Sequence, residues 1–160
     1  MKSLVIFYSL TGKTRLVSQT IAEALNAELV EIEEVKPRRR GFTTFLTGGF
    51  AAMKNKGSKI RLVNISWNQY DTIFIGSPIW ASSPTPAVNS LVYVSDFKSQ
   101  SIVPFFTMGG DNSDKALENI TAKIERNQGK VISSFAIKSY GVTDDEIIHK
   151  AKQAIMNYTN

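Results

Sequence analysis

The sequence predicts one doubly wound α/β domain, in which a parallel sheet of five strands carries helices on both faces. Short apolar runs alternate along the chain with segments of helical periodicity, and this alternation is typical of parallel sheets. The length of 160 residues fits one domain, and the chain has no internal repeat or low-complexity tract. We therefore expect a single domain over residues 1–160.

Four segments supply the first half of this pattern. Ser3–Ser9 is a continuous apolar run and predicts a buried strand, and Thr14–Leu25 places its apolar residues on one helical face. Ala27–Glu34 alternates apolar and acidic residues, which is typical of an edge or half-covered strand. Asp71–Ser77 is again apolar and predicts a third, buried strand.

The alternation continues in the second half. Pro84–Val94 predicts a helix, because proline is tolerated in a first helical turn. Ser101–Gly110 predicts the fourth strand, with Pro104 as an irregularity inside it. Ser113–Gln128 is amphipathic and predicts the next helix, with Gly129 closing it as a C-cap.

The C-terminal segment completes the pattern. Lys130–Ile137 contains five apolar residues and predicts the fifth strand. Thr143 and Glu146 have the spacing of a capping box, in which each side chain accepts a hydrogen bond from the backbone of the other residue. The last helix therefore begins at Thr143 and turns Ile147 and Ala151 inward.

Residues 36–61, called the insert below, are irregular and take the place of the second crossover helix. Phe42, Phe45, Phe50 and Met53 recur near helical spacing, although two glycines interrupt them. One interpretation is that these side chains pack on the sheet, and the other is a flap that faces a partner or a membrane. The insert also carries the following cations and no acidic residue: Lys36, Arg38, Arg39, Arg40, Lys54, Lys56, Lys59 and Arg61.

Charge and cysteine content narrow the function classes. The net charge is +5, and the cations of the insert favour an acidic partner, a nucleic acid, an anionic membrane or a phosphorylated ligand, unless the insert is only a solvated loop. The chain has no cysteine, which excludes thiol nucleophiles and disulfides and fits a cytoplasmic protein. No apolar stretch approaches the roughly 20 residues that span a bilayer, and the N-terminal run is too short for a signal peptide.

Three loops leave the C-terminal edge of the predicted sheet, where ligands bind in doubly wound folds. The first loop, Ser9–Lys13, is rich in hydroxyl groups; the second, Ser77–Thr85, combines prolines with a tryptophan; the third, Thr107–Ser113, has paired glycines that permit close approach of a ligand. We expect Trp80 to be exposed and to stack on a planar ring, and the alternative is an indole folded back on the core.

The first loop runs into Gly-Lys-Thr, the ending of a nucleotide P-loop. However, Phe7 stands where the first P-loop glycine would be, and Asp71–Ser77 ends without the acidic metal ligand that a triphosphatase needs. These residues argue against an NTPase. Ser9, Thr11 and Thr14 instead supply hydroxyl groups at a helix N-terminus, which suits a single phosphate monoester. The alternative is that Ser9 or Thr11 only caps the helix.

In these loops the chain resembles a flavodoxin, and the resemblance extends over essentially the whole chain. The family's phosphate loop has the form S/T-x-T-G-x-T, which Ser9–Thr14 matches, and the loop after its third strand often has a glycine, a polar residue and a ring-stacking tryptophan, as in Gly76–Trp80. The resemblance implies non-covalent FMN, with its phosphate in the first loop and its isoalloxazine ring between the other two. The implied FMN-binding residues are Ser9, Leu10, Thr11, Gly12, Lys13, Thr14, Ser77, Pro78, Ile79, Trp80, Ala81, Thr107, Met108, Gly109, Gly110 and Asp111.

The resemblance also implies a three-layer fold with strand order 2-1-3-4-5, of the short-chain branch in which no insertion splits the fifth strand. Three features depart from the family. Thr107–Ser113 has no aromatic residue, so one flavin face is open or covered by another segment. Ala81 replaces a glycine whose peptide flips to stabilise the half-reduced flavin, and a positive φ costs alanine about 1 kcal/mol more than glycine. Lastly, electron-carrier flavodoxins are usually acidic, whereas this chain is basic. Because the insert carries much of this positive charge and follows the second predicted strand, we expect it to form a flap beside the flavin.

The resemblance implies a small electron-transfer protein that shuttles electrons between redox partners, and the basic insert favours acidic ones. The alternative is an NAD(P)H-dependent quinone or flavin reductase, in which an open flavin face admits a nicotinamide or a quinone. No residue stands out as its proton donor, because the only histidine, His149, lies in the last predicted helix. Nucleic-acid binding is the least favoured interpretation and predicts a steep salt dependence.

Overall fold

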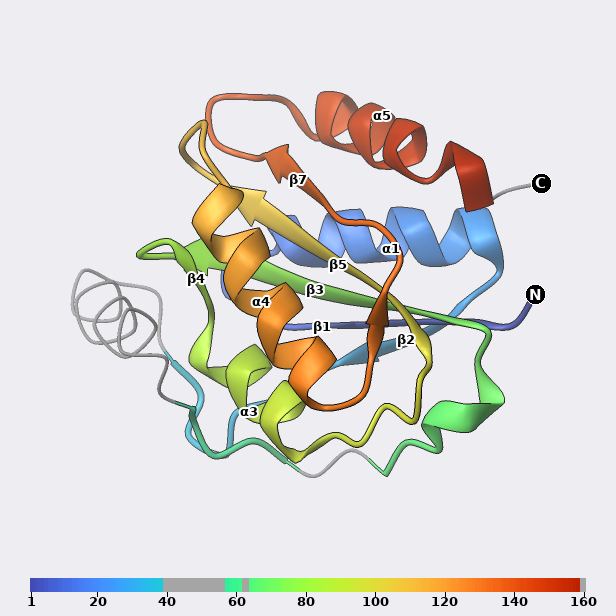
Figure 1. Cartoon of the computed structure of the whole chain (residues 1–160). Coiled ribbons are helices and arrows are strands. Elements are labelled where there is room, and N and C mark those ends of the chain that lie inside the picture. The colour runs from blue at the N-terminus through green and yellow to red at the C-terminus, as the bar shows by residue number, and fades with distance from the viewer. Residues whose placement is uncertain (39–56, 62–63, 159–160) are drawn as a thin grey trace.

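The computed structural model describes residues 1–38, 57–61 and 64–158. These residues form a three-layer α/β fold, with a sheet between two pairs of helices (Figure 1). The strands are β1 (Ser3–Phe7), β2 (Glu28–Glu31), β3 (Thr72–Trp80), β4 (Ser83–Pro84), β5 (Ser101–Met108), β6 (Lys130–Val131) and β7 (Phe135–Lys138). The helices are α1 (Lys13–Leu25), α3 (Pro86–Val94), α4 (Asp114–Arg126) and α5 (Asp144–Ala154), with short 3-10 helices η1 (Trp67–Gln69) and η2 (Met156–Tyr158).

The parallel path of the sheet runs β2-β1-β3-β5-β6, and β7 pairs with the C-terminal half of β5. The two-residue β4 lies off this path and pairs antiparallel with the end of β3. Thus β5 is the fourth strand expected from the sequence, and β6 and β7 together are the fifth. The predicted order 2-1-3-4-5 is confirmed.

Helices α1 and α5 cover one face of the sheet, and α3 and α4 cover the other (Figure 1). Alternate strand residues enter the two cores, because successive side chains of a strand point to opposite faces. In β3, Ile73 and Ile75 pack in the core of α3 and α4, whereas Phe74 packs in the core of α1 and α5. All three are fully buried, which explains why this strand reads as a continuous apolar run.

The fifth strand differs from the prediction, because Lys130–Ile137 divides into two short strands at residues 132–134. Ile132 N donates to Ile102 O at 3.1 Å, so the backbone groups of Ile102 face this edge strand. Pro104, two residues further along β5, faces the same side and has no N–H to donate. The missing donor explains the break that stands opposite it.

The two predicted helix ends have different outcomes. The capping box is confirmed: Thr143 Oγ1 accepts from Glu146 N at 3.2 Å, and the Glu146 carboxylate accepts from Thr143 N at 2.7 Å. The C-cap role of Gly129 is wrong, because Gln128 takes the left-handed conformation, with φ 62°. Gly129 is instead required by packing, since a Cβ there would lie 2.5 Å from Ile124 Cγ2.

The helical spacing predicted between Phe42 and Met53 lies outside the described residues. The residues just before the insert run antiparallel to its described C-terminal end: Val35 N donates to Lys59 O at 2.8 Å, and Glu34 forms a bridge with Ile60. In the part of the chain that the structure describes, no helix has the length and apolarity needed to cross a membrane.

Candidate functional site

The three loops that follow the central strands meet at one edge of the sheet. The register places Phe7 beside Gly76, and Pro78 beside Thr107. The first and third loops are also joined directly, because the buried hydroxyl groups of Thr14 and Thr107 lie 2.8 Å apart and share a hydrogen bond. The sequence prediction that these loops are neighbours is therefore correct.

In the first loop, one serine hydroxyl organises the start of α1. Ser9 Oγ accepts hydrogen bonds from Gly12 N at 3.1 Å and from Arg15 N at 3.3 Å. Gly12 is the N-cap residue, with φ 93°, and it has no side chain to cap the helix. Ser9 therefore does part of the capping that the sequence left as an alternative, while Thr11 is exposed beside it.

Lys13 points to another part of the molecule. Its ammonium group donates to Asp144 Oδ1 at 2.7 Å, and this ion pair links α1 to the start of α5. Arg15 makes a bidentate pair with Glu31, at 2.9 and 2.7 Å, and so ties α1 to β2. The two cations in the first turn of α1 are thus both paired with carboxylates of neighbouring elements.

The second loop is shorter than the sequence predicts, because Ser77–Trp80 continues β3 and pairs with β4 as a hairpin. Trp80 is not exposed: only 9% of its surface is accessible, and its ring meets Tyr8 edge-on at 6.1 Å. The alternative of an indole folded on the core is therefore correct in this structure. The physical reason is that the hairpin turns the indole inward, where it buries more apolar surface than an exposed loop could.

Ala81 and Ser82 form the two-residue turn of this hairpin. Both have positive φ, 47° and 59°, as a tight turn with the twist of the strands requires. The conformation costs a non-glycine residue roughly 1–2 kcal/mol. Below the turn, the buried Ser77 Oγ accepts from Thr85 N at 3.0 Å, and this bond anchors the start of α3.

A buried polar network that the sequence did not suggest connects the insert to this hairpin. Tyr8 Oη donates to Glu34 Oε2 at 3.1 Å, and Arg38 Nε donates to both Glu34 oxygens at 3.1 Å. The Arg38 guanidinium lies 5.7 Å from the Trp80 ring centroid. Burial, and secondarily Glu34, raises the pKa of the Tyr8 phenol above its ordinary range. A cavity of about 200 Å³ opens here, beside Ser9.

In the third loop, Thr107 and Met108 end β5, and Gly109 and Gly110 are exposed. A Cβ on Gly110 would meet nothing within 4 Å, so the space beside this glycine is open. Asp111 pairs with Lys138 Nζ at 2.6 Å.

One exposed aromatic residue that the sequence did not assign lies beside this loop. A Cβ on Gly109 would lie 3.7 Å from Cβ of Tyr140, whose surface is 78% exposed. Ser139 N donates to Met108 O at 2.8 Å and holds the Tyr140 segment against the third loop. The adjoining Tyr-Gly turn, with Gly141 at φ 70°, was the available sequence signal.

A family model described as Flavodoxin matches residues 2–144. Comparison with curated proteins finds no match. Among solved structures, a Lactobacillus acidophilus NCFM flavoprotein in complex with FMN has a TM-score of 0.75 at 24% identity, covering 94% of this chain and 98% of that one. A flavodoxin from the domain Archaea has a TM-score of 0.65 at 12% identity, covering 99% and 96%. Oxidised flavodoxin 1 from Bacillus cereus has a TM-score of 0.62 at 14% identity, and the match covers 99% of this chain and 97% of that one. At these identities the structural likeness concerns the fold.

Proposed function

The chain belongs to the flavodoxin family, and on that premise we propose that it binds FMN and carries electrons between redox partner proteins. The observation that carries the proposal is the 2.8 Å hydrogen bond between Thr14 and Thr107. This bond holds the helix N-terminus opened by Gly12 beside the end of β5, so one ligand can contact both loops.

The first loop fits the phosphate of FMN. Beyond its chain neighbours, a Cβ on Gly12 would have Arg15 Nη1, at 4.0 Å, as its nearest contact, so the backbone is open to a ligand. The N–H groups at the start of α1 and the helix dipole stabilise negative charge at this position. The exposed Thr11 adds a hydroxyl group on the same turn.

We propose that the isoalloxazine ring lies between the second and third loops. When bound, FMN supplies the redox chemistry, and the chain binds and shields the ring. Gly109 and Gly110 let the ring approach the backbone, and Tyr140 replaces the aromatic residue that the third loop lacks. Trp80 is buried against Tyr8, so stacking on the ring requires the indole to turn outward, and the positive φ angles of Ala81 and Ser82 next to it mark a strained turn.

The charge near the ring comes from the insert. Arg38 is the described cation of the insert that lies against Trp80, and it is partly balanced by Glu34. A guanidinium beside the ring favours the anionic reduced form of FMN over the oxidised form. The net charge of +5 favours acidic redox partners, because opposite charges steer association.

Two measurements test this proposal. The absorption spectrum of the purified protein, with and without added FMN, should show the two visible flavin bands; a colourless protein that FMN cannot reconstitute would contradict it. Stopped-flow mixing of the FMN-loaded protein with NADPH alone should leave the flavin oxidised, because a carrier receives electrons from a partner protein. Fast bleaching by NADPH would support the reductase instead.

A further inference from the structure

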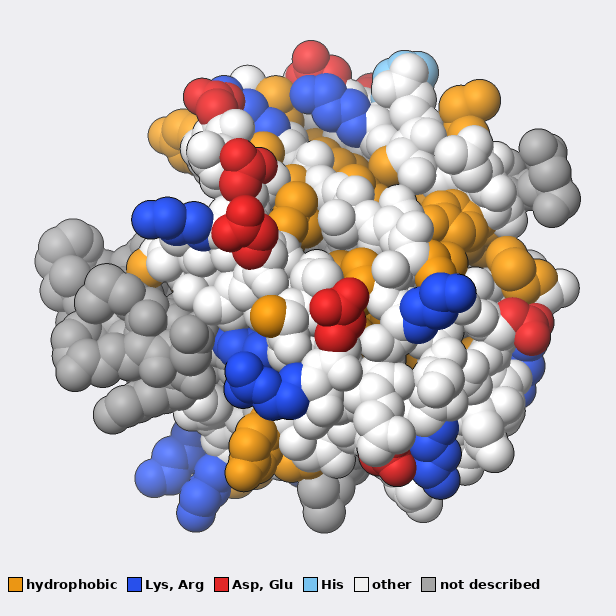
Figure 2. Space-filling view, viewed as in Figure 1, with side chains coloured by type: hydrophobic (Ala, Val, Ile, Leu, Met, Phe, Trp, Pro, Cys, Tyr) orange, Lys and Arg blue, Asp and Glu red, His pale blue; other side chains and the backbone are white. Residues whose placement is uncertain are grey.

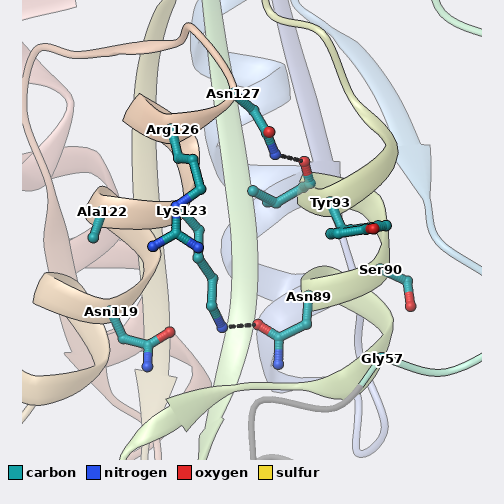
Figure 3. A pocket seen from close by; sticks show the side chains of 10 residues that line it. Gly57, Asn89, Ser90, Tyr93, Asn119, Ala122, Lys123, Arg126 and Asn127 are labelled. Carbon is teal, nitrogen blue, oxygen red and sulfur yellow. Dashed lines mark hydrogen bonds between the residues drawn. The ribbon is translucent and has the colours of Figure 1, made fainter.

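A groove of about 620 Å³ lies between α3 and α4, on one face of the sheet and away from the three loops (Figure 3). Its described lining residues are Gly57, Asn89, Ser90, Val92, Tyr93, Asn119, Ala122, Lys123, Arg126 and Asn127. None of them belongs to the first, second or third loop. The volume lies within the range of roughly 300–1,000 Å³ that is usual for small-molecule sites.

The groove gathers positive charge. Lys123 and Arg126 extend into it from one face of α4 (Figure 3), and no Asp or Glu is among its described lining residues. Lys123 is half-buried; burial, and then the charge of Arg126, lowers the pKa of its ammonium group to about 8. Figure 2 views this side of the molecule, with Lys and Arg side chains over α3 and α4. Two like charges held together in a concave surface favour binding of an anion.

The polar groups around Lys123 are held in place before any ligand arrives. Asn89 Oδ1 accepts from Lys123 Nζ at 2.6 Å, and Asn89 Nδ2 donates to Pro84 O at 3.3 Å. At the other end of the groove, the Asn127 amide is bonded to Val92 O. Such preorganisation lowers the entropy cost of binding.

Apolar surface lies beside these polar groups. Ala122 lines the groove, and the Tyr93 ring, 83% exposed, stands at its rim. A ligand that fills this space therefore carries an anionic group beside an apolar body. A multivalent polyanion such as a nucleic acid would need a wider basic surface than two cations in a concavity.

We propose that the α3–α4 groove is a second binding site, for a small molecule whose carboxylate or phosphate group contacts Lys123 and Arg126 while its apolar body packs on Ala122 and Tyr93. The groove shares no lining residue with the three loops, although Asn89 is bonded to Pro84 of the second loop. Anion binding at the groove can therefore be measured separately from FMN binding.

Residue-resolved NMR tests this site. The ¹⁵N-labelled protein as purified, with and without added FMN, is titrated at constant ionic strength with benzoate, with its neutral analogue benzamide, and with inorganic phosphate. We expect saturable shifts of the backbone amides of Asn89, Asn119 and Lys123 with benzoate or with phosphate, and much weaker ones with benzamide. The two anions tell whether the site prefers a carboxylate or a phosphate. Phosphate bound at the first loop is recognised because it shifts Gly12 instead.

Three variants check the contacts. Lys123→Met keeps the aliphatic stem, and Arg126→Gln removes a surface charge; each should weaken anion binding by about tenfold, the effect of losing one charge-assisted hydrogen bond. The matched control Lys152→Met removes an exposed lysine from α5, on the opposite face of the sheet, and should change nothing. Thermal unfolding verifies that every variant is folded.

The proposal is overturned if neither anion shifts the groove amides, if benzamide shifts them as strongly as benzoate, or if both groove variants keep wild-type affinity. Shifts produced by polyglutamate but by neither small anion would assign the groove to an acidic protein partner, and would also overturn it.

Discussion

Substitution of Gly76 by alanine tests how tightly the central strands are packed beneath the site. Gly76 lies in β3 between β1 and β5, and a Cβ there would lie 2.4 Å from Phe105 Cζ and 2.9 Å from Phe7 Cβ. The Phe105 ring cannot move aside easily, because it stacks on Phe135 with centroids 5.4 Å apart and planes inclined by 10°. The added methyl group must therefore displace a fully buried ring or a strand, and we expect a loss of about 1–3 kcal/mol in the free energy of unfolding.

Urea titration followed by circular dichroism measures this loss. Gly76→Ala should lower the midpoint at an unchanged slope. The matched control is Gly110→Ala, because Gly110 has no positive φ and a Cβ there would meet nothing within 4 Å; we expect a change within about 0.5 kcal/mol. In the Gly76→Ala background, Phe105→Leu should lower the free energy of unfolding by less than it does in the wild type. The reason is that it removes the ring atoms with which the new Cβ collides. A wild-type midpoint for Gly76→Ala, or fully additive effects in the double variant, would refute the steric argument.

Three other predictions concern the site and the last helix. Gly12→Val should weaken FMN binding by more than about tenfold in fluorescence titration, because valine is strained at φ 93°. Lys13→Ala should bind FMN as the wild type does, because Lys13 pairs with Asp144; weaker binding would contradict the view that Lys13 does not contact the phosphate. Glu34→Gln should cost about 1.5–3 kcal/mol in urea unfolding and alter the tryptophan emission, because Arg38 loses its buried carboxylate; unchanged stability would show that the pair is neutral. Hydrogen bonds from the backbone N–H of Thr143 and, second, from its hydroxyl group lower the pKa of Glu146. The stability that Glu146 contributes should therefore be present above its unfolded pKa of about 4.3 and be lost as the pH falls through its lower folded pKa. The melting temperatures of wild type and Glu146→Gln should therefore differ more at neutral than at acidic pH, and a pH-independent difference would contradict this.

The fold could be predicted to the level of strand order, and the errors have local causes. The apolar residues of Lys130–Ile137 predict one strand, but it breaks at residues 132–134, where Ser133 and Ser134 stand and where Pro104 of the neighbouring strand offers no N–H. Glycine is common at a C-cap, and so Gly129 is predicted to be one, whereas a Cβ there would collide with Ile124 Cγ2 at 2.5 Å and with Ile102 Cδ1 at 2.7 Å. In both cases a residue of the neighbouring strand β5, Pro104 or Ile102, contributes to the outcome.

The candidate site could be predicted in its loops but not in its contacts. Glycine and proline in Gly76–Trp80 are ordinary loop signals, yet the segment continues as a strand, since only glycine fits beside Phe105 and the hairpin buries the indole. Tyr140 could not be assigned, because its place beside Gly109 depends on how the last strand is seated on β5.

The sequence by itself determined the apolar strands, the amphipathic helices, the capping box at Thr143 and the hydroxyl-rich turn before α1. These features depend on residues within one strand or helical turn, so local pattern is sufficient for them. Only the tertiary structure decided that Thr14 bonds Thr107, 93 residues away, and that Tyr8 bonds Glu34, 26 residues away. Such pairs form because sheet order and register bring the strand ends together, and no local pattern contains that information.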